Sequence, residues 1–268
     1  MSLPAPRPEG TALITGASSG IGSSIARELA KRRLNVTLVA RREERLRELA
    51  GELVDEHGVD AGIITADLGT REGRDQVSAK LKQLGLGVDL LVNNAGFGYA
   101  GDFASAERER QVEMVAVNCE AVVDLTSRFL PAMVGRGAGG VINIASTAAF
   151  QPMPKGATYA ATKAFVLSFS EALHSEVAGS GVSVTAVCPG PVKTEFMDAS
   201  GIKGEEKLPR LFWHSPDDIA EAALKAAESG RRSVIPGVVN HAGTILGRYT
   251  PRTVSLPITK RFWSQASK

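Results

Sequence analysis

The chain has 268 residues, 43% of them hydrophobic and 22% charged, with a formal net charge of +2 at pH 7. These values are typical of a soluble globular protein with room for one large α/β domain, and so small a net charge does not favour nucleic-acid binding. The start of the chain carries no apolar segment of a signal peptide, and no stretch approaches the roughly 18 apolar residues of a membrane span, so we expect a cytosolic protein.

Short apolar runs alternate with longer amphipathic segments along the chain. Strands are predicted at residues 11–15, 35–40, 61–67, 88–96, 140–146, 182–190 and 233–237. Helices are predicted at residues 21–32, 41–58, 71–84 and 107–134, the last of them ending near Pro131, and another helix follows residue 146. Because the strand segments are rich in Val and Ile and do not alternate with polar residues, they favour a parallel sheet with helices on both faces. We therefore predict a single doubly wound α/β domain over residues 1–268, with its core over about 10–237.

A glycine-rich turn follows the first predicted strand. Gly16, Gly20 and Gly22 have the spacing G-x-x-x-G-x-G and stand where a helix begins, with Ser18, Ser19 and Ile21 between them. Glycines let the backbone turn tightly and approach a pyrophosphate, which then binds the free N–H groups of the helix N-terminus. Tight turns use glycine without any ligand. The strand-turn-helix context is what makes this a predicted dinucleotide site.

The end of the second predicted strand indicates which dinucleotide is bound. Such sites often place Asp or Glu about 20 residues after the glycine turn, where it accepts a hydrogen bond from the ribose 2′-OH. Ala40 stands there instead, followed by Arg41 and Arg42, and a guanidinium suits a 2′-phosphate. Pairing at i,i+4 within the charged helix accounts for Arg45 and Arg47 but not for the missing acid. We predict NADP(H) as the preferred cofactor, with NAD(H) as the alternative.

Tyr159 and Lys163 are four residues apart in the segment YAATK, and Ser146 lies thirteen positions before Tyr159. Four residues make about one helical turn, so the phenol and the ammonium share a helix face. Together with Ser146 they offer a proton donor, a charge that tunes it and a hydroxyl that can hold a carbonyl oxygen. Each residue alone is more often a packing or capping residue than a catalytic one. In combination with a cofactor turn they predict hydride-transfer catalysis, since none of them can carry a hydride.

At this point the chain resembles the short-chain dehydrogenase/reductase family over about residues 10–237. The matching motifs are TGASSGIG at 15–22, Asp67–Leu68, NNAG at 93–96, Asn118, Ser146, YAATK at 159–163 and PGPVKT at 189–194. The resemblance implies a Rossmann-type sheet of seven strands and a homodimer or homotetramer. It also implies a catalytic tetrad of Asn118, Ser146, Tyr159 and Lys163. In that tetrad Asn118 holds a water that links Lys163 to solvent.

The same resemblance implies the contacts of the cofactor. Asp67 and Leu68 contact its adenine side, and Asn94, Ala95 and Gly96 pack beside the adenosine ribose. Tyr159 and Lys163 touch the nicotinamide end, where Lys163 reaches the ribose. The segment after the sixth strand holds the nicotinamide, with Val192 and Thr194 at its carboxamide, and this segment includes Pro189 and Gly190.

The substrate end is expected to be apolar. Residues 195–214 show no clear hydrophobic periodicity and are predicted to form a mobile lid over the substrate. The apolar side chains expected to line the cleft are Phe150, Met153, Phe196, Met197, Leu211, Phe212 and Trp213. Residues 238–268 form a basic extension without Asp or Glu, whose apolar residues include Ile245, Leu246, Tyr249, Phe262 and Trp263. We expect this extension to pack on the domain. The alternatives are that it closes the cleft, covers another subunit or lies on an anionic membrane.

The cysteines and histidines do not indicate a metal site or a disulfide. Cys119 and Cys188 are far apart and form no CxxC motif, which fits a reducing compartment, and the four histidines show no metal-ligand spacing. We predict an oxidoreductase that transfers hydride between NADP(H) and the carbonyl or secondary alcohol of a lipophilic substrate, with Tyr159 as general acid/base. The alternatives are an NADP(H)-binding regulatory or scaffold protein without turnover and an NAD(H)-dependent dehydrogenase.

Overall fold

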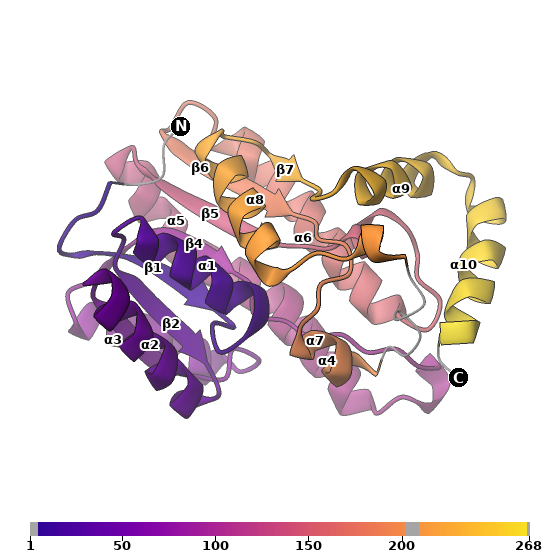
Figure 1. The fold of residues 1–268 in the computed structure, drawn as a ribbon, viewed down its shortest axis with the longest axis horizontal. Coiled ribbons are helices and arrows are strands. Elements are labelled where there is room, and N and C mark those ends of the chain that lie inside the picture. The colour runs from indigo at the N-terminus through magenta and orange to yellow at the C-terminus, as the bar shows by residue number, and fades with distance from the viewer. Residues whose placement is uncertain (1–4, 202–208, 267–268) are drawn as a thin grey trace.

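A computed structural model describes residues 5–201 and 209–266 of the chain. Its strands form one sheet in the order β3-β2-β1-β4-β5-β6-β7, and all neighbouring strands are parallel (Figure 1). The strands are β1 (Gly10–Thr15), β2 (Val36–Ala40), β3 (Ala61–Thr65), β4 (Gly87–Asn93), β5 (Gly139–Ile144), β6 (Val182–Val187) and β7 (Ser233–Val234). The Rossmann-type, doubly wound α/β fold predicted from the sequence is confirmed.

Helices connect and cover the strands. The α-helices are α1 (Gly20–Lys31), α2 (Glu43–His57), α3 (Arg71–Gln83), α4 (Arg108–Val115), α5 (Ala121–Arg136), α6 (Ala157–Glu176), α7 (Glu195–Ser200), α8 (Pro216–Glu228), α9 (Val238–Tyr249) and α10 (Arg252–Ala266). Short 3-10 turns occur at η1 (Phe103–Ser105), η3 (Thr147–Phe150) and η5 (Arg210–Phe212). A π-helical segment, η2 (Ala116–Glu120), joins α4 to α5. In the described part of the chain, no helix is both long and apolar enough to cross a bilayer.

The two faces of the sheet bury separate cores. On one face Ile14 and Leu38 pack with side chains from α1, α2 and α8, and on the other Leu13 and Val39 pack with side chains from α3 and α5. Successive strand residues point to opposite faces, so a strand covered on both sides needs apolar residues throughout. This double covering explains the continuous Val- and Ile-rich runs.

Helix α5 continues past the point predicted for its end. Pro131 lies inside the helix, which runs on to Arg136 and ends at Gly137, whose φ is +68°. An interior proline costs about 3 kcal/mol because it lacks an N–H group and its ring crowds the preceding turn. Met133, one turn before the end, is fully buried in the core shared with α3. Burial of this last turn outweighs the local preference of proline, which is why the prediction was wrong.

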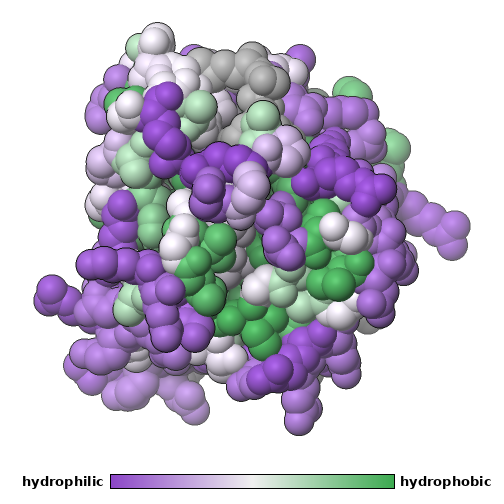
Figure 2. All heavy atoms as spheres, turned by 90° about the vertical axis from the view of Figure 1, so that its left-hand side faces the viewer, coloured by the Kyte–Doolittle hydropathy of each residue, from purple (hydrophilic) through white to green (hydrophobic). Residues whose placement is uncertain are grey.

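The strand order places the site. The chain crosses from β3 at one edge back to β4, beside β1, so the direction of strand addition reverses between β1 and β4. Ligands of open α/β sheets bind outside the carboxyl ends of the strands at such a reversal. Helices α7, α9 and α10 lie on one side of the molecule (Figure 1). Figure 2 shows the opposite end, where hydrophilic side chains form the rim and apolar side chains gather in the middle.

Candidate active site

A cavity of about 670 Å³ runs along the carboxyl ends of the strands. Nineteen of the predicted site residues line it, from the glycine turn to the segment after β6. They are Gly16, Ser18, Ser19, Gly20, Ile21, Arg41, Arg42, Asp67, Leu68, Asn94, Ala95, Gly96, Ser146, Tyr159, Lys163, Pro189, Gly190, Val192 and Thr194. Gly22 and Asn118 do not line the cavity but lie behind its wall. The sequence motifs, although spread along the chain, therefore meet in one place.

The glycine turn has the backbone that a pyrophosphate requires. Gly16 and Gly20 have φ values of +65° and +57°, in the left-handed region that favours glycine. A Cβ at Gly22 would lie 2.5 Å from Asn94 Nδ2, so Gly22 permits the close packing of α1 rather than ligand contact. Ser19 caps α1 without a side-chain hydrogen bond to the first turn. The turn thus fits a dinucleotide phosphate at the helix N-terminus.

Asn94 fixes the loop after β4 to the glycine turn. Its Nδ2 donates to the carbonyl oxygens of Thr15 at 2.9 Å and Gly16 at 3.2 Å. The backbone N–H groups of Asn94 and Ala95 both donate to Thr15 Oγ1 at 2.9 Å. A Cβ at Gly96 would lie 2.8 Å from Asn118 Oδ1, so only glycine leaves the loop this close to η2. These bonds set the position at which an adenosine ribose would pack.

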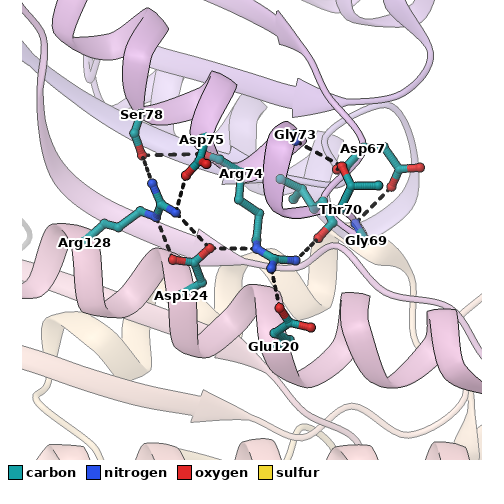
Figure 3. A network of polar contacts seen from close by, with 11 residues as sticks. Asp67, Gly69, Thr70, Gly73, Arg74, Asp75, Ser78, Glu120, Asp124 and Arg128 are labelled. Carbon is teal, nitrogen blue, oxygen red and sulfur yellow. Dashed lines mark hydrogen bonds and ion pairs between the residues drawn. The ribbon is translucent and has the colours of Figure 1, made fainter.

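The loop that carries Asp67 and Leu68 is held by the ion-pair network in Figure 3. Asp67 Oδ1 accepts from Gly69 N at 2.9 Å, and the buried Arg74 donates from Nη1 to the carbonyl oxygen of Leu68 at 3.0 Å. Arg74 Nε donates to Asp124 Oδ2 at 2.7 Å, and Nη2 donates to Glu120. The pKa of Asp124 is held below its usual range, chiefly by its hydrogen bond to Arg128 and further by Arg74. The network ties the loop to α5 and orients its backbone toward the cavity.

Both predicted phosphate-binding arginines have carboxylate partners in the structure. Arg41 Nη1 donates to Glu113 at 3.2 Å, and Arg42 Nη1 donates to Glu195 at 2.8 Å. Arg45 does not pair within its own helix as predicted; it donates to Glu195 at 2.5 Å, 150 residues away. The i,i+4 pairing of Arg47 with Glu43 does form. The correction for Arg45 arises because α7 brings a carboxylate next to the start of α2.

Helix α6 places Tyr159 and Lys163 on one face, one turn apart. Both side chains are buried, and Lys163 Nζ lies 5.8 Å from the centre of the Tyr159 ring. Nζ donates to the carbonyl oxygen of Ile144 at the end of β5, at 2.8 Å. Burial lowers the pKa of Lys163 to about 8. Since that value is still above neutral pH, the side chain is mainly charged there and can stabilise a phenolate.

Ser146 and Asn118 complete the predicted tetrad from two different positions. Ser146 follows β5, lines the cavity, and accepts from Ala148 N at 3.1 Å, so its hydroxyl proton is still available. Asn118 Oδ1 accepts from Phe97 N at 3.1 Å, and its Nδ2 donates to Phe97 O and to Thr162 Oγ1, each at 3.0 Å. Both amide protons are therefore used, so the Asn118 side chain can bind a water only as a hydrogen-bond acceptor. A π-helical turn, a frequent feature of functional sites, carries this residue.

The walls of the predicted substrate end differ in part from the prediction. The predicted residues that line the cavity are Phe150, Met153, Phe196, Met197 and Phe212. Leu211 and Trp213 do not line it, and 69% of the Leu211 surface is exposed. The predicted lid is partly helical, in α7 and η5, while residues 202–208 lie outside the described part of the chain.

Helix α9 supplies a wall that the sequence analysis did not assign to the site. Its residues at the cavity are Val239, Asn240, Gly243, Thr244 and Gly247. Asn240 Nδ2 donates to Phe212 O at 3.1 Å, and Gly190 leaves room for that amide, which a Cβ there would overlap. The sequence signal was a small or polar face at 240, 244 and 247, opposite the apolar positions 238, 245 and 249. Within the tail, helix α9 therefore forms one wall of the cavity. The side chains of Phe262 and Trp263 and residues 267–268 lie outside the described part.

The chain was compared with known families and proteins. The family model described as short chain dehydrogenase matches residues 10–203. The chain belongs to the short-chain dehydrogenase family. As a short-chain dehydrogenase it is an oxidoreductase that binds a nicotinamide cofactor.

Several named relatives and solved structures are similar to the chain. A very-long-chain 3-oxoacyl-CoA reductase of Anas platyrhynchos is 36% identical over 206 residues, which make up 75% of this chain but only 65% of that protein. A putative ketoacyl reductase of Streptomyces coelicolor is 37% identical over 256 residues, covering 89% of this chain and 97% of the relative. The structure of a short-chain dehydrogenase from Sphingobium yanoikuyae in complex with NADPH has a TM-score of 0.78 and 32% identity, and the match covers 97% of this chain and 96% of that one.

Proposed function

We propose that the chain transfers a hydride between NADP(H) and a carbonyl or secondary alcohol group of a lipophilic substrate. One observation carries this proposal: a single cavity joins the glycine turn and two arginines at one end to Ser146, Tyr159 and an apolar wall at the other. A scaffold protein would need the cofactor end but not the buried Tyr159 and Lys163 beside an apolar cleft. Turnover is therefore favoured over a regulatory or scaffold role.

The chain's own groups handle the proton of the reaction. When bound, the nicotinamide would supply or accept the hydride. In the reducing direction the Tyr159 hydroxyl donates its proton to the carbonyl oxygen, which Ser146 orients by a hydrogen bond. The ammonium of Lys163 stabilises the phenolate left behind, and its burial beside the ring strengthens that effect. In the oxidising direction the same phenolate removes the proton from the alcohol.

The preference for NADP(H) over NAD(H) has two supports. Arg41 and Arg42 line the cavity at the carboxyl end of β2, and Ala40 stands where an NAD(H) site often has Asp or Glu. The similar structure from Sphingobium yanoikuyae was solved with NADPH. The lipophilic substrate is supported by Phe150, Met153 and Phe196 in the cavity wall, and by relatives named as ketoacyl and 3-oxoacyl-CoA reductases. The cytosolic location and the homodimer or homotetramer stay predictions.

Turnover is tested by following NADPH oxidation with a panel of acyl, steroid-like and aryl ketones. We expect activity with at least one of them, and Tyr159→Phe to lower kcat by about 10²- to 10⁴-fold because the proton donor is lost. Calorimetric titration should give the same NADPH affinity for both proteins, which shows that the variant keeps its fold. Tight NADPH binding without turnover of any ketone would instead support the regulatory or scaffold role.

A further inference from the structure

Glu195 already occupies the arginines at the predicted phosphate end of the cavity. Its carboxylate accepts from Arg42 Nη1 at 2.8 Å and from Arg45 Nη1 at 2.5 Å. The other nitrogens of Arg42 donate to the hydroxyls of Ser18 and Ser19, between 2.9 and 3.2 Å. One carboxylate thus bridges two guanidiniums directly above the glycine turn. Arg42 first, then Arg45, lowers the pKa of Glu195 to about 2, so the carboxylate is ionised throughout the neutral range.

A phosphate on the adenosine ribose needs the same donors. Arg42, Ser18, Ser19 and Glu195 all line the cavity, so the bridging carboxylate lies within the space that a dinucleotide would enter. Carboxylate and phosphate oxygens bind a guanidinium through the same charge-assisted geometry. Two anions at the same guanidinium repel each other. A 2′-phosphate that binds Arg42 Nη1 therefore competes with Glu195 for this donor.

The position of Glu195 in the chain links this exchange to the catalytic end. It is the first residue of α7, between Thr194 and Phe196. Thr194 packs against the glycine turn, where its Cγ2 would be 2.9 Å from a Cβ at Gly20. The Phe196 ring centre lies 5.6 Å from that of Tyr159. Three consecutive residues thus reach from the phosphate end of the cavity to the proton donor.

We propose that Glu195 is an internal substitute for the cofactor's 2′-phosphate, and that exchange of the two anions at Arg42 breaks the bridge to Arg45 and releases α7. This inference rests on the proposed use of NADP(H). It makes Glu195 a specificity-determining residue: a dinucleotide without a 2′-phosphate leaves the bridge closed and α7 held. Glu195 therefore lowers the affinity for a 2′-phosphate in the wild type, and only a dinucleotide that carries this phosphate frees α7.

The competition is tested by calorimetry with 2′,5′-ADP and 5′-AMP, which differ only in the 2′-phosphate. We expect Glu195→Gln to bind 2′,5′-ADP about fivefold more tightly than the wild type, the range of an exposed ion pair, and to bind 5′-AMP unchanged. Glu43→Gln is the matched control. Glu43 also accepts from an arginine, Arg47, and stands at the start of α2, but it does not line the cavity. That variant should bind both nucleotides as the wild type does.

Hydrogen exchange at the amides of α7 measures the release. In the wild type, 2′,5′-ADP should speed exchange there and 5′-AMP should not, whereas Glu195→Gln should exchange fast without any nucleotide. If the wild type prefers 2′,5′-ADP while Glu195→Gln shows no gain in affinity and no change in exchange, the inference is wrong and NADP(H) preference stands. If the wild type binds both nucleotides equally, the proposed cofactor preference fails, and the inference fails with it.

Discussion

Lys163 is the residue at which the needs of stability and of the proposed catalysis conflict. Its side chain is buried, and burial lowers its pKa from 10.5 to about 8. The unfolded chain therefore binds more protons than the folded one between about pH 8 and 10.5. Stability rises with pH across that window, and the full cost of burying the charge is present below it. A residue that costs stability at the pH where the protein works is a sign of function.

Replacing Lys163 with Met should make the protein more stable and less active. A shift of this size corresponds to about 3 kcal/mol, so we expect Lys163→Met to raise the free energy of unfolding at pH 7 by up to that amount. The gain should shrink as the pH rises through this window and approach zero above pH 10.5, where the lysine is mainly neutral in both states. Urea titrations at several pH values measure this.

The exposed Lys82 in α3 is the matched control for that experiment. Lys82→Met removes the same charge without removing a buried one, so its effect on stability should stay within about 0.5 kcal/mol at each pH. Lower stability of Lys163→Met than of the wild type at pH 7 would contradict the argument. It would mean that the hydrogen bond from Lys163 to Ile144 outweighs the cost of burial.

At the scale of elements, α9 decides the shape of the substrate end. Its inner face is buried through Asn240, Thr244 and Gly247, while Val238 and Leu246 on the outer face are 88% and 68% exposed. The inner face forms one wall of the cavity. Contact of the outer face with another subunit or with a membrane stays a prediction, which liposome co-sedimentation and measurement of the oligomeric state would separate.

Filling the cavity from α9 should narrow the range of substrates. A Cβ at Gly243 would meet no atom within 4 Å, and Gly243 lines the cavity. A leucine side chain has space at this position, and leucine stabilises a helix by about 1 kcal/mol relative to glycine. We therefore expect Gly243→Leu to lower kcat/KM for bulky ketones by at least about tenfold and to spare small ones.

Gly51 in α2 provides the control for the α9 variant. A Cβ at Gly51 also meets no atom within 4 Å, and this residue does not line the cavity. Gly51→Leu should show a similar gain in thermal stability without any change in substrate preference. Equal kinetics of the two variants with bulky and small ketones would show that α9 does not limit substrate size.

At the scale of the whole molecule, the two helix layers pack against opposite faces of the same sheet. Leu13 and Ile14 are neighbours in β1 yet belong to the two different cores. Neither layer can lose its packing without exposing strands that the other layer covers. The chain should therefore unfold as one unit, in line with the predicted single domain.

Calorimetry of thermal unfolding tests that expectation. We expect one transition, shifted upward by NADPH because the ligand binds only the folded state. At 100 times the dissociation constant the stabilisation is about 2.7 kcal/mol, and NADH at the same concentration should give less. Two resolved transitions would contradict a single domain, and an equal shift with NADH would contradict the cofactor preference.

Much of the fold and of the site could be predicted because the signals are local in sequence. A tight turn needs its own glycines, so Gly16 and Gly20 identify it without any knowledge of distant residues. Tyr159 and Lys163 share a face because a helix repeats in under four residues. Continuous apolar strands mark a sheet covered on both faces. These properties depend on residues within a few positions of one another, and the sequence by itself determined them.

Only the tertiary structure decided what depends on residues far apart in the chain. Packing of Met133 carries α5 past Pro131, and α7 brings Glu195 to Arg45 across 150 residues. Asn118 lies behind Gly96 rather than on the cavity, and Asn240 docks α9 as a wall of the site. None of these contacts leaves a periodic pattern, since each forms only when the sheet has fixed the separation of its helices. The motifs of the predicted cofactor end can be recognised in the sequence, whereas the walls of the predicted substrate end depend on how distant elements pack.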